Sequence, residues 1–331
     1  MKILFCREDF SKGLPWQGLA PYLENHEIVT CDREHILDHL HGVDILVPSW
    51  ATIGRDIIEN GSFGLIYQFG VGLEKVDIDA ATQNGVYVTR IPAAGSGNAE
   101  TVSEHAIFLM LALSRHFFQT QQIMQDALTT GKWGQPAGSG LYNKTACIVG
   151  LGDIGAAVAR RLAPFGMRLT GIRQNPEKGA PKGTDFAAIY GTDKLEKGLA
   201  EADYVIISVN YGQHNHHMFN AEALASIKPG AFIINIARGG LIDHDALQAA
   251  LASGKIAGAG LDVFWEEPVD FRHPIFQYNV IATPHIAGLT DSFYLNGARI
   301  FAENVNRYTR GQALHQIVNT PKNPRHPLTA E

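Results

Sequence analysis

The sequence predicts an α/β protein with two parallel-sheet domains. Short apolar segments rich in β-branched residues alternate with amphipathic helical patterns along the whole chain, and few hairpin signals separate them. The chain has 331 residues, which is more than one hydrophobic core usually organises. Hydrophobic residues make up 45% of the composition and charged residues 18%, as expected for a folded globular chain.

Five segments predict the strands of the first sheet. They are residues 2–6, 27–31, 44–48, 65–70 and 86–91. Amphipathic patterns over residues 34–41 and 51–60 predict helices between these strands. A long apolar-periodic segment follows over residues 98–128, with Asn98 as its N-cap and Gly131 as a stop signal beyond it. This segment predicts one long helix.

Six further segments predict a second sheet. They are residues 146–149, 168–172, 204–209, 232–236, 258–263 and 280–283. Helical patterns lie between most of them, at residues 155–165, 221–226 and 244–253, and six strands joined by crossovers make a complete doubly wound sheet. A closing helix is expected at residues 291–310. Residues 320–331 contain three prolines and are expected to form a surface tail.

Charge and composition argue against several classes of protein. The net charge is −6 and the isoelectric point is about 6.2, which does not favour a nucleic-acid or anionic-membrane surface. The longest apolar stretch, residues 106–113, is too short to span a membrane. Charged residues from Arg7 onward interrupt the apolar N-terminal run, so no signal peptide is expected. Three cysteines without metal-ligand spacing fit a reduced, cytoplasmic protein.

A strand that runs into a glycine turn and then a helix predicts a dinucleotide-binding loop. Gly150 permits the tight turn, Gly152 lets the backbone approach a pyrophosphate, and Gly155 lets the helix pack on the strand. The N-terminal amides of the helix would then meet the phosphates. The alternative is a well-packed turn with no ligand. The context favours a Rossmann-like nucleotide domain.

The end of the next strand bears on the choice of coenzyme. An NAD-type unit places Asp or Glu there to bind the ribose hydroxyls, but this sequence has Arg173 and no carboxylate before Glu177. A guanidinium can bind a 2′-phosphate through two parallel hydrogen bonds, whereas a carboxylate would repel it. Arg173 therefore favours NADP, with NAD as the alternative. An exposed arginine without a ligand is the other interpretation.

Three chemically versatile residues follow three strands of the second sheet. Arg238, Glu267 and His285 each lie just past the carboxyl end of a predicted strand. Ligands of open α/β sheets bind at this edge. The three residues are therefore expected at the ligand-binding edge of the second sheet.

With these motifs the sequence resembles the D-isomer-specific 2-hydroxyacid dehydrogenases, a family that includes phosphoglycerate, glyoxylate/hydroxypyruvate and D-lactate dehydrogenases. The resemblance runs from the Gly-Val-Gly motif at residues 70–72 through residues 98–100 and 104–105 to His285. The spacings of 29 residues from Arg238 to Glu267 and 18 residues from Glu267 to His285 fit the family.

The resemblance implies a role for each residue of the active site. Arg238 would bind the substrate carboxylate and polarise the ketone. His285 would donate a proton to the carbonyl oxygen as the hydride arrives, and Glu267 would hydrogen-bond the other imidazole nitrogen. The backbone amides of Val71 and Gly72 would form the second contact with the substrate carboxylate.

The resemblance also implies the cofactor contacts. Asp262 corresponds to the residue that meets the nicotinamide carboxamide. The other expected contacts, besides the glycine loop and Arg173, are Asp153, Ile154, Val209, Ile236, Ala237, His285 and Gly288.

The family organisation implies two domains with the active site in the cleft between them. Residues 1–98 and 289–331 would form a discontinuous, flavodoxin-like substrate-binding (catalytic) domain, and residues 99–288 the NAD(P)-binding Rossmann domain. Dimerisation through the long-helix region is a further implication. Glu104 and His105 on the long helix are expected to tether the domains rather than to act in catalysis.

Together these features predict an NADP-preferring 2-ketoacid reductase that acts on a small 2-ketoacid or 2-hydroxyacid. Two alternatives stay open: a formate- or phosphite-type dehydrogenase, and a dinucleotide-sensing regulatory protein on the same fold. The sequence also contains His214, His216 and His217 close together. No carboxylate or cysteine stands at a useful spacing from them, so no metal site is expected.

Overall fold

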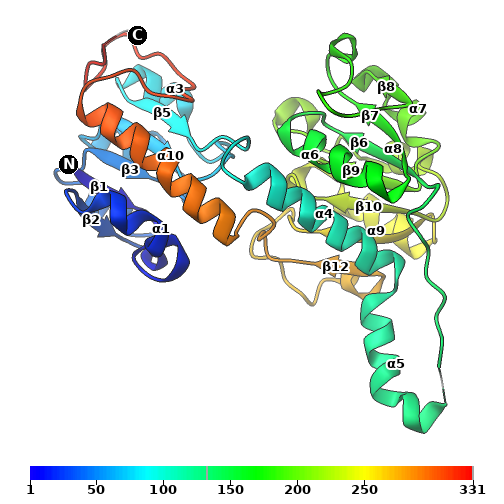
Figure 1. Cartoon of the computed structure of the whole chain (residues 1–331). Helices are drawn as coiled ribbons and strands as arrows, with labels where there is room; N and C mark the ends of the chain where they lie inside the picture. The colour runs from blue at the N-terminus through cyan, green and yellow to red at the C-terminus, as the bar shows by residue number, and fades with distance from the viewer. Residues whose placement is uncertain (132, 330–331) are drawn as a thin grey trace. The chain divides into compact units, whose positions relative to one another are not determined.

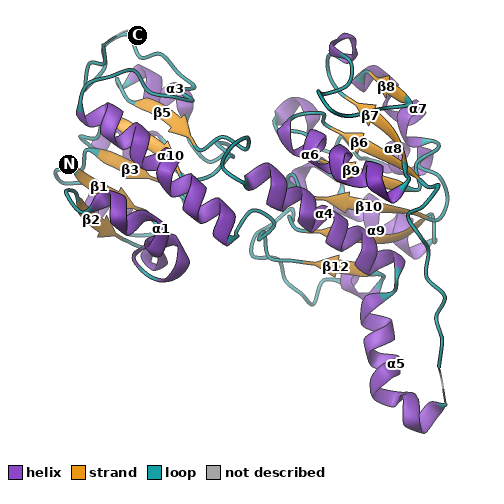
Figure 2. Cartoon of the chain, viewed as in Figure 1, coloured by secondary structure: helices purple, strands orange, loops and turns teal. Residues whose placement is uncertain are grey.

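The computed structural model describes residues 1–131 and 133–329 (Figure 1). The chain divides into two compact units: unit 1 consists of Met1–Asn98 and Leu289–Glu331, and unit 2 consists of Ala99–Gly288. Each unit contains a sheet in which every paired strand is parallel (Figure 2). The predicted α/β class with two parallel sheets is therefore confirmed.

Unit 1 contains a five-stranded sheet in the order β2-β1-β3-β4-β5, which is the flavodoxin-like order. Its strands are β1 (Lys2–Phe5), β2 (Glu27–Thr30), β3 (Ile45–Val47), β4 (Leu65–Gln68) and β5 (Tyr87–Arg90). Its helices are α1 (Gly13–Leu23), α2 (Arg55–Asn60), α3 (Ile78–Gln83) and α10 (Asp291–Thr309).

Alternate strand residues of unit 1 face the two helical layers, as the two-residue period of a strand requires. Ile3 and Phe5 of β1 pack in the same apolar cluster as α1 and α10, whereas Leu4 packs in the cluster that contains α2 and α3. The returning helix α10 lies close against α1, since a Cβ at Gly18 would meet the carbonyl oxygen of Tyr294. The C-terminal helix thus completes the core of the N-terminal sheet.

Unit 2 contains a seven-stranded sheet in the order β12-β11-β10-β9-β6-β7-β8. Its strands are β6 (Thr145–Val149), β7 (Arg168–Ile172), β8 (Ala188–Tyr190), β9 (Tyr204–Ile207), β10 (Ala231–Asn235), β11 (Ile256–Leu261) and β12 (Val280–Ala282). The chain reverses its strand order between β6 and β9, which is the switch point of a Rossmann-like sheet.

Helices cover both faces of this sheet, and each face has its own apolar cluster. The helices of unit 2, of which α5 does not pack on the sheet, are α4 (Asn98–Ser114), α5 (Phe117–Thr130), α6 (Asp153–Leu162), α7 (Leu195–Leu199), α8 (Ala221–Ser226) and α9 (His244–Ala252). Short 3-10 helices are η1 (Glu8–Ser11), η2 (Ile36–His39), η3 (Ala163–Phe165), η4 (Pro176–Lys178), η5 (Thr192–Lys194), η6 (Gln213–Asn215), η7 (Gly239–Leu241) and η8 (Pro274–Gln277). No helix in the described part of the chain is both long and apolar enough to cross a membrane.

The prediction of a single long helix over residues 98–128 is wrong. The chain forms α4 and then α5, and His116 between them has a left-handed φ of 52°. The hydroxyl of Ser114, the last residue of α4, donates to the carbonyl of Met110, a local bond that competes with helix continuation. Helix α5 has no buried residue and extends away from the sheet of unit 2 (Figure 1).

Three smaller expectations also differ from the structure. Residues 34–41 form only the short η2, and the second expected helix begins at Arg55 rather than at residue 51. The second sheet has a seventh strand, β8, whose three residues are too few for a period to be visible.

The expected surface tail has many exposed residues in its described part, but it is attached to unit 1 through Arg325. Arg325 is half-buried, and its guanidinium donates to the carbonyls of Ile58, Gly61 and Phe63 in unit 1. Residues 330 and 331 lie outside the described part of the chain.

Candidate functional site

The carboxyl edge of the unit 2 sheet gathers the three residues that the sequence singled out. Arg238 follows β10, Glu267 follows β11 and His285 follows β12, and these strands are neighbours in the sheet. Because parallel strands end at one edge, loops that are distant in sequence meet there. The register of the sheet therefore places the three loops side by side.

His285 and Glu267 form a hydrogen-bonded pair. The His285 Nδ1 lies 2.9 Å from the Glu267 Oε2, and the two side chains are only 24% and 28% exposed. The second oxygen, Oε1, accepts the backbone N–H of Phe264, which fixes the carboxylate. A carboxylate can only accept, so Nδ1 carries a hydrogen in this contact and the ring orients Nε2 away from the glutamate.

A buried carboxylate holds the turn that carries His285. Asp262 is 1% exposed; its Oδ1 accepts from the Thr283 hydroxyl at 2.7 Å and from the Ile286 amide at 2.9 Å, and its Oδ2 accepts from the Ala287 amide at 3.0 Å. The amide of His285 donates to the Asp262 carbonyl at 2.8 Å.

His285 has a φ of 54°, in the left-handed region, which costs about 1–2 kcal/mol for a residue with a Cβ. The bonds to Asp262 offset that cost. The sequence did not predict this structural role of Asp262. The sequence feature that could have indicated it is an acidic residue at the end of an apolar strand.

Helix α4 reaches the same turn through His105. Its Nε2 lies 2.9 Å from the Thr283 Oγ1 and 3.6 Å from the Asp262 Oδ1. Burial lowers the pKa of His105, and the Asp262 charge opposes that shift without cancelling it. Both partners of His105 belong to unit 2, and Glu104 pairs with Arg161 in the same unit. These contacts lie within unit 2, and the expectation that the two residues tether the domains stays a prediction.

Arg238 is positioned by a buried asparagine. Asn235, 1% exposed at the end of β10, accepts the amide of Ala237 and donates to the carbonyl of Arg238. The Arg238 Nη1 donates to the Ala237 carbonyl at 2.6 Å. A Cβ at Gly239 would collide with the carbonyl group of Phe264, so only glycine lets this loop approach the loop that carries Glu267. Asn235 and Gly239 were missed because their roles depend on neighbouring loops.

The Glu267 loop is anchored by Trp265. The Trp265 ring stacks on His244 at a centroid distance of 4.6 Å and lies 4.9 Å from the ring of His273.

Two other histidines, His216 and His217, stack on each other, and His216 contacts the hydroxyl of Tyr211. No group of side chains with metal-ligand geometry occurs among residues 1–131 and 133–329.

The glycine loop leaves room for a dinucleotide and for close packing. Gly150 has a φ of 99°, and a Cβ there would meet the backbone of Ser208 and Val209. A Cβ at Gly155 would collide with the Gly150 carbonyl, whereas a Cβ at Gly152 would meet nothing within 4 Å. Helix α6 begins directly after Gly152, which has no capping side chain, so its first amides face the space in front of the loop. These features fit a bound pyrophosphate.

The other expected cofactor residues lie at the same edge of unit 2. Asp153 and Ile154 open α6, and the rest follow the ends of neighbouring strands: Val209, Ile236, Ala237 and Gly288. Arg173 directly follows β7, and its Nη1 donates to the Gly179 carbonyl at 2.8 Å. The arginine therefore also shapes the loop after β7.

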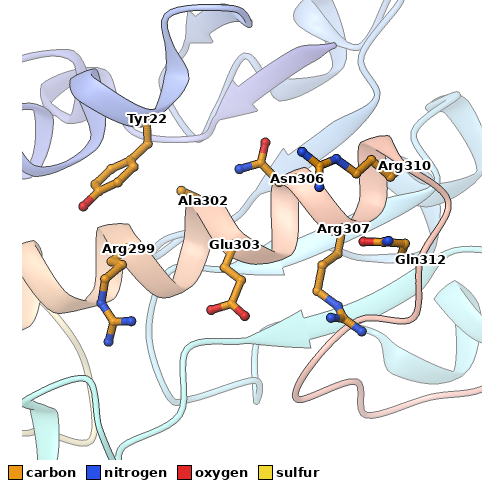
Figure 3. Close-up of a pocket in the computed structure, with 8 residues that line it drawn as sticks. All are labelled: Tyr22, Arg299, Ala302, Glu303, Asn306, Arg307, Arg310 and Gln312. Carbon is orange, nitrogen blue, oxygen red and sulfur yellow. The ribbon is translucent and has the colours of Figure 1, made fainter. Parts of the chain in front are cut away.

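Unit 1 contains the remaining expected residues. Val71 and Gly72 follow β4, and the Val71 carbonyl accepts a 2.8 Å bond from the Arg90 guanidinium at the end of β5. A separate polar pocket of about 420 Å³ lies between Tyr22 of α1 and the face of α10 that carries Arg299, Glu303 and Arg310 (Figure 3). None of the expected site residues lines it.

Comparison with known proteins identifies relatives over most of the chain. The family model "D-isomer specific 2-hydroxyacid dehydrogenase, NAD binding domain" matches residues 107–287. Glyoxylate reductase of Pyrococcus furiosus is 33% identical, over 93% of this chain and 94% of its own. Hydroxypyruvate reductase of Thermotoga maritima is 37% identical, over 78% of this chain and 82% of its own. The apo-structure of D-lactate dehydrogenase from Escherichia coli superposes with a TM-score of 0.78 at 27% sequence identity. The match covers 96% of this chain and 100% of the D-lactate dehydrogenase chain.

Proposed function

Because the chain belongs to the D-isomer specific 2-hydroxyacid dehydrogenase family, we propose that it reduces a small 2-ketoacid to the D-2-hydroxyacid with NADPH. The family supports an oxidoreductase that acts on CH–OH donors with a nicotinamide dinucleotide. The observation that carries the finer proposal is the 2.9 Å contact between His285 and Glu267. A paired imidazole at the ligand-binding edge of the sheet is the geometry that acid–base catalysis on a carbonyl requires.

In this proposal His285 transfers the proton. Its Nδ1 stays bonded to Glu267, which fixes the orientation of the ring, so Nε2 can donate to the ketone oxygen during reduction and withdraw the proton during oxidation. Arg238 binds the substrate carboxylate and polarises the carbonyl, a task suited to a planar, permanently charged group. The bound nicotinamide supplies the hydride.

The dinucleotide would be held by unit 2. The glycine loop accommodates the pyrophosphate, and the contacts proposed along the dinucleotide are Asp153, Ile154, Val209, Ile236, Ala237, Asp262, His285 and Gly288. Asp262 still has one acceptor position on Oδ2 after its three protein bonds, which is what a carboxamide N–H needs.

A preference for NADP over NAD is proposed from Arg173. The position after β7 carries a guanidinium where NAD enzymes place an acid, and one of its nitrogens already bonds Gly179. That bond keeps the side chain at the strand end, which lowers the entropic cost of binding a 2′-phosphate.

The amides of Val71 and Gly72 are proposed to bind the substrate carboxylate. The Arg90 guanidinium holds the Val71 carbonyl, and the peptide that carries this carbonyl also carries the Gly72 amide. Glyoxylate and hydroxypyruvate are the first substrates to test, since relatives over most of the chain are reductases of these acids.

A homodimer is proposed because α5 exposes large apolar side chains. Phe118 is 63% exposed, Met124 57% and Leu128 fully exposed, and the helix has no buried residue. An apolar helix without cover favours a protein partner, and a second copy of the chain is the simplest one.

A cytoplasmic location is proposed from the free, buried Cys6, Cys31 and Cys147, which suit a reducing compartment.

Turnover tests the main proposal. The loss of reduced-nicotinamide absorbance is followed with NADPH and with NADH against glyoxylate, hydroxypyruvate, pyruvate and bulkier 2-ketoacids. Ketoacid-dependent oxidation, faster with NADPH, is the expected result. Tight binding of NADPH without oxidation by any 2-ketoacid would indicate a dinucleotide-sensing protein instead.

A further inference from the structure

His105, on α4, is the strongest feature that the proposed function leaves unused. Its Nε2 is 2.9 Å from the hydroxyl oxygen of Thr283, the first residue after β12. The side chain is only 16% exposed, and the nearest ring is that of Phe108, 5.7 Å away. A buried imidazole that bonds the loop of another imidazole needs a physical explanation.

The directions of the hydrogen bonds between His105, Thr283 and Asp262 follow from the donors and acceptors that each side chain has. The Thr283 hydroxyl donates to the Asp262 Oδ1 over 2.7 Å. The hydroxyl has one hydrogen, and its oxygen therefore accepts from the Nε2–H of His105. The chain of bonds runs from His105 through Thr283 to Asp262, with both hydrogens pointing toward the carboxylate.

The far end of this chain sets the conformation of the His285 turn. The same Oδ1 accepts the amide of Ile286, and Oδ2 accepts the amide of Ala287. His285 lies between these bonds and the Thr283 bond, in a left-handed conformation that needs outside support. A carboxylate that rotated would release both amides together.

We propose that His105 and Thr283 are positioning residues that lock the Asp262 carboxylate and thereby orient His285 for proton transfer. They touch neither substrate nor cofactor in this proposal, which rests on the proposed role of His285. The Oδ1 of Asp262 lies 3.6 Å from the His105 Nε2, whereas the neighbouring Glu104 on the same helix pairs with Arg161. Burial lowers the pKa of His105. A neutral ring must carry its hydrogen on Nε2 to donate to Thr283.

Paired substitutions separate hydrogen bonding from packing. Thr283→Val and His105→Leu keep most of the volume and remove the bonds, and we expect kcat to fall about tenfold or more while the NADPH dissociation constant changes less than threefold. Thr283→Ser and His105→Gln restore a hydroxyl and an N–H donor near the original positions and should recover most of kcat. The double variant should be little worse than Thr283→Val alone, because both changes break one chain.

Amide hydrogen exchange provides a readout that does not depend on turnover. Thr283→Val should accelerate exchange at Ile286 and Ala287, and the matched control Thr170→Val, a buried threonine on β7, should change neither exchange there nor kcat.

Three results would overturn the inference. They are a kcat for Thr283→Val and His105→Leu within twofold of the wild type, equal losses in the Ser and Gln variants, or unchanged exchange at both amides. If instead the wild-type protein oxidises NADPH with no 2-ketoacid, the proposed function fails, and the exchange experiment still decides whether Thr283 orders the turn.

Discussion

At the scale of single residues, the proposed site depends on hydrogen bonds that each leave a side chain in one orientation. His285 donates through Nδ1 to Glu267, so only its other nitrogen can serve a substrate, and the turn around it is tied to Asp262 at several points. Spacing along the sequence identified the His–Glu–Arg set. The supporting residues, Asn235 and Thr283, carry no pattern of their own because their partners come from the folded loops.

The first prediction concerns His285→Asn. The asparagine amide can occupy the site but cannot exchange a proton at neutral pH, so kcat should fall by about a thousandfold. The NADPH dissociation constant, measured by fluorescence titration, should change little. His214→Asn, in the loop after β9, is the matched control and should keep both constants. Equal loss of turnover and nucleotide binding would contradict the acid–base assignment.

The second prediction concerns coenzyme choice. Arg173→Asp replaces a group that attracts the 2′-phosphate by one that repels it, so the ratio of kcat/KM for NADPH to that for NADH should fall at least tenfold. Arg168→Asp, at the other end of β7, is the control and should leave the ratio unchanged. An unchanged ratio in the Arg173 variant would remove this residue from the cofactor site.

At the scale of elements, the buried strands of unit 2 and the exposed helix α5 are suited to different tasks. The strands β10 and β11, which precede Arg238 and Glu267, are buried throughout or nearly so, whereas α5 has no buried residue. A buried parallel strand is a rigid support for the loop that follows it. An uncovered apolar helix gives no such support and is suited to binding a partner.

The third prediction tests α5. Leu128→Glu places a charge on the exposed apolar face and should convert the proposed dimer to a monomer, which light scattering coupled to size-exclusion chromatography would detect as a halved mass. Leu37→Glu, an exposed leucine of η2 in unit 1, is the control and should stay dimeric. A wild-type protein that is monomeric at micromolar concentration would refute the dimer.

The fourth prediction concerns Asp203, which links three segments of the unit 2 sheet. Burial raises the pKa of this carboxyl, but the Lys228 hydrogen bond, the Thr145 amide and the charges of Lys144 and Lys228 together lower it below the ordinary aspartate value. The unfolded chain therefore takes up a proton first as pH falls. The stabilisation is fully present above the ordinary pKa and is lost as pH falls through the folded-state pKa.

Asp203→Asn should accordingly lower the free energy of unfolding at pH 7 by about 1–2 kcal/mol. In urea titrations at a series of pH values, the difference from the wild type should shrink as the solution becomes more acidic than the aspartate range. A difference that stays constant down to acid pH would show that ionisation contributes nothing.

At the scale of the whole molecule, two cores are built from one chain that leaves unit 1 at Asn98 and returns at Leu289. The returning helix α10 supplies Phe293, Phe301 and Val305 to the core of the N-terminal sheet. The nucleotide features belong entirely to unit 2. Binding should therefore stabilise the two units unequally.

The fifth prediction follows from this division. NADPH at a hundredfold excess over its dissociation constant should stabilise the unit that binds it by about 2.7 kcal/mol. In hydrogen-exchange mass spectrometry, the slowest amides of β6–β12 should gain more protection than those of β1–β5. Equal gains in both sheets would contradict the assignment of the dinucleotide to unit 2.

Local patterns were sufficient for most of the strands, the glycine turn and the order of the site residues, since strand burial and turn chemistry are properties of neighbouring residues. They failed where the outcome depends on the backbone conformation of a single residue or on distant partners. The break at His116, the short strand β8 and the packing of Arg325 on unit 1 each involve contacts or conformations that no periodicity encodes.

The sequence alone thus determined the class of fold, and it predicted the edge of the sheet proposed for the chemistry and the residue types available there. Only the tertiary structure decided that Nδ1 of His285 meets Glu267, that Asp262 holds the turn, and that His105 reaches that turn through Thr283. The physical reason is that a hydrogen bond requires atoms within about 3 Å in a defined direction. Strand register and loop packing, which act over more than a hundred residues of chain, set that geometry.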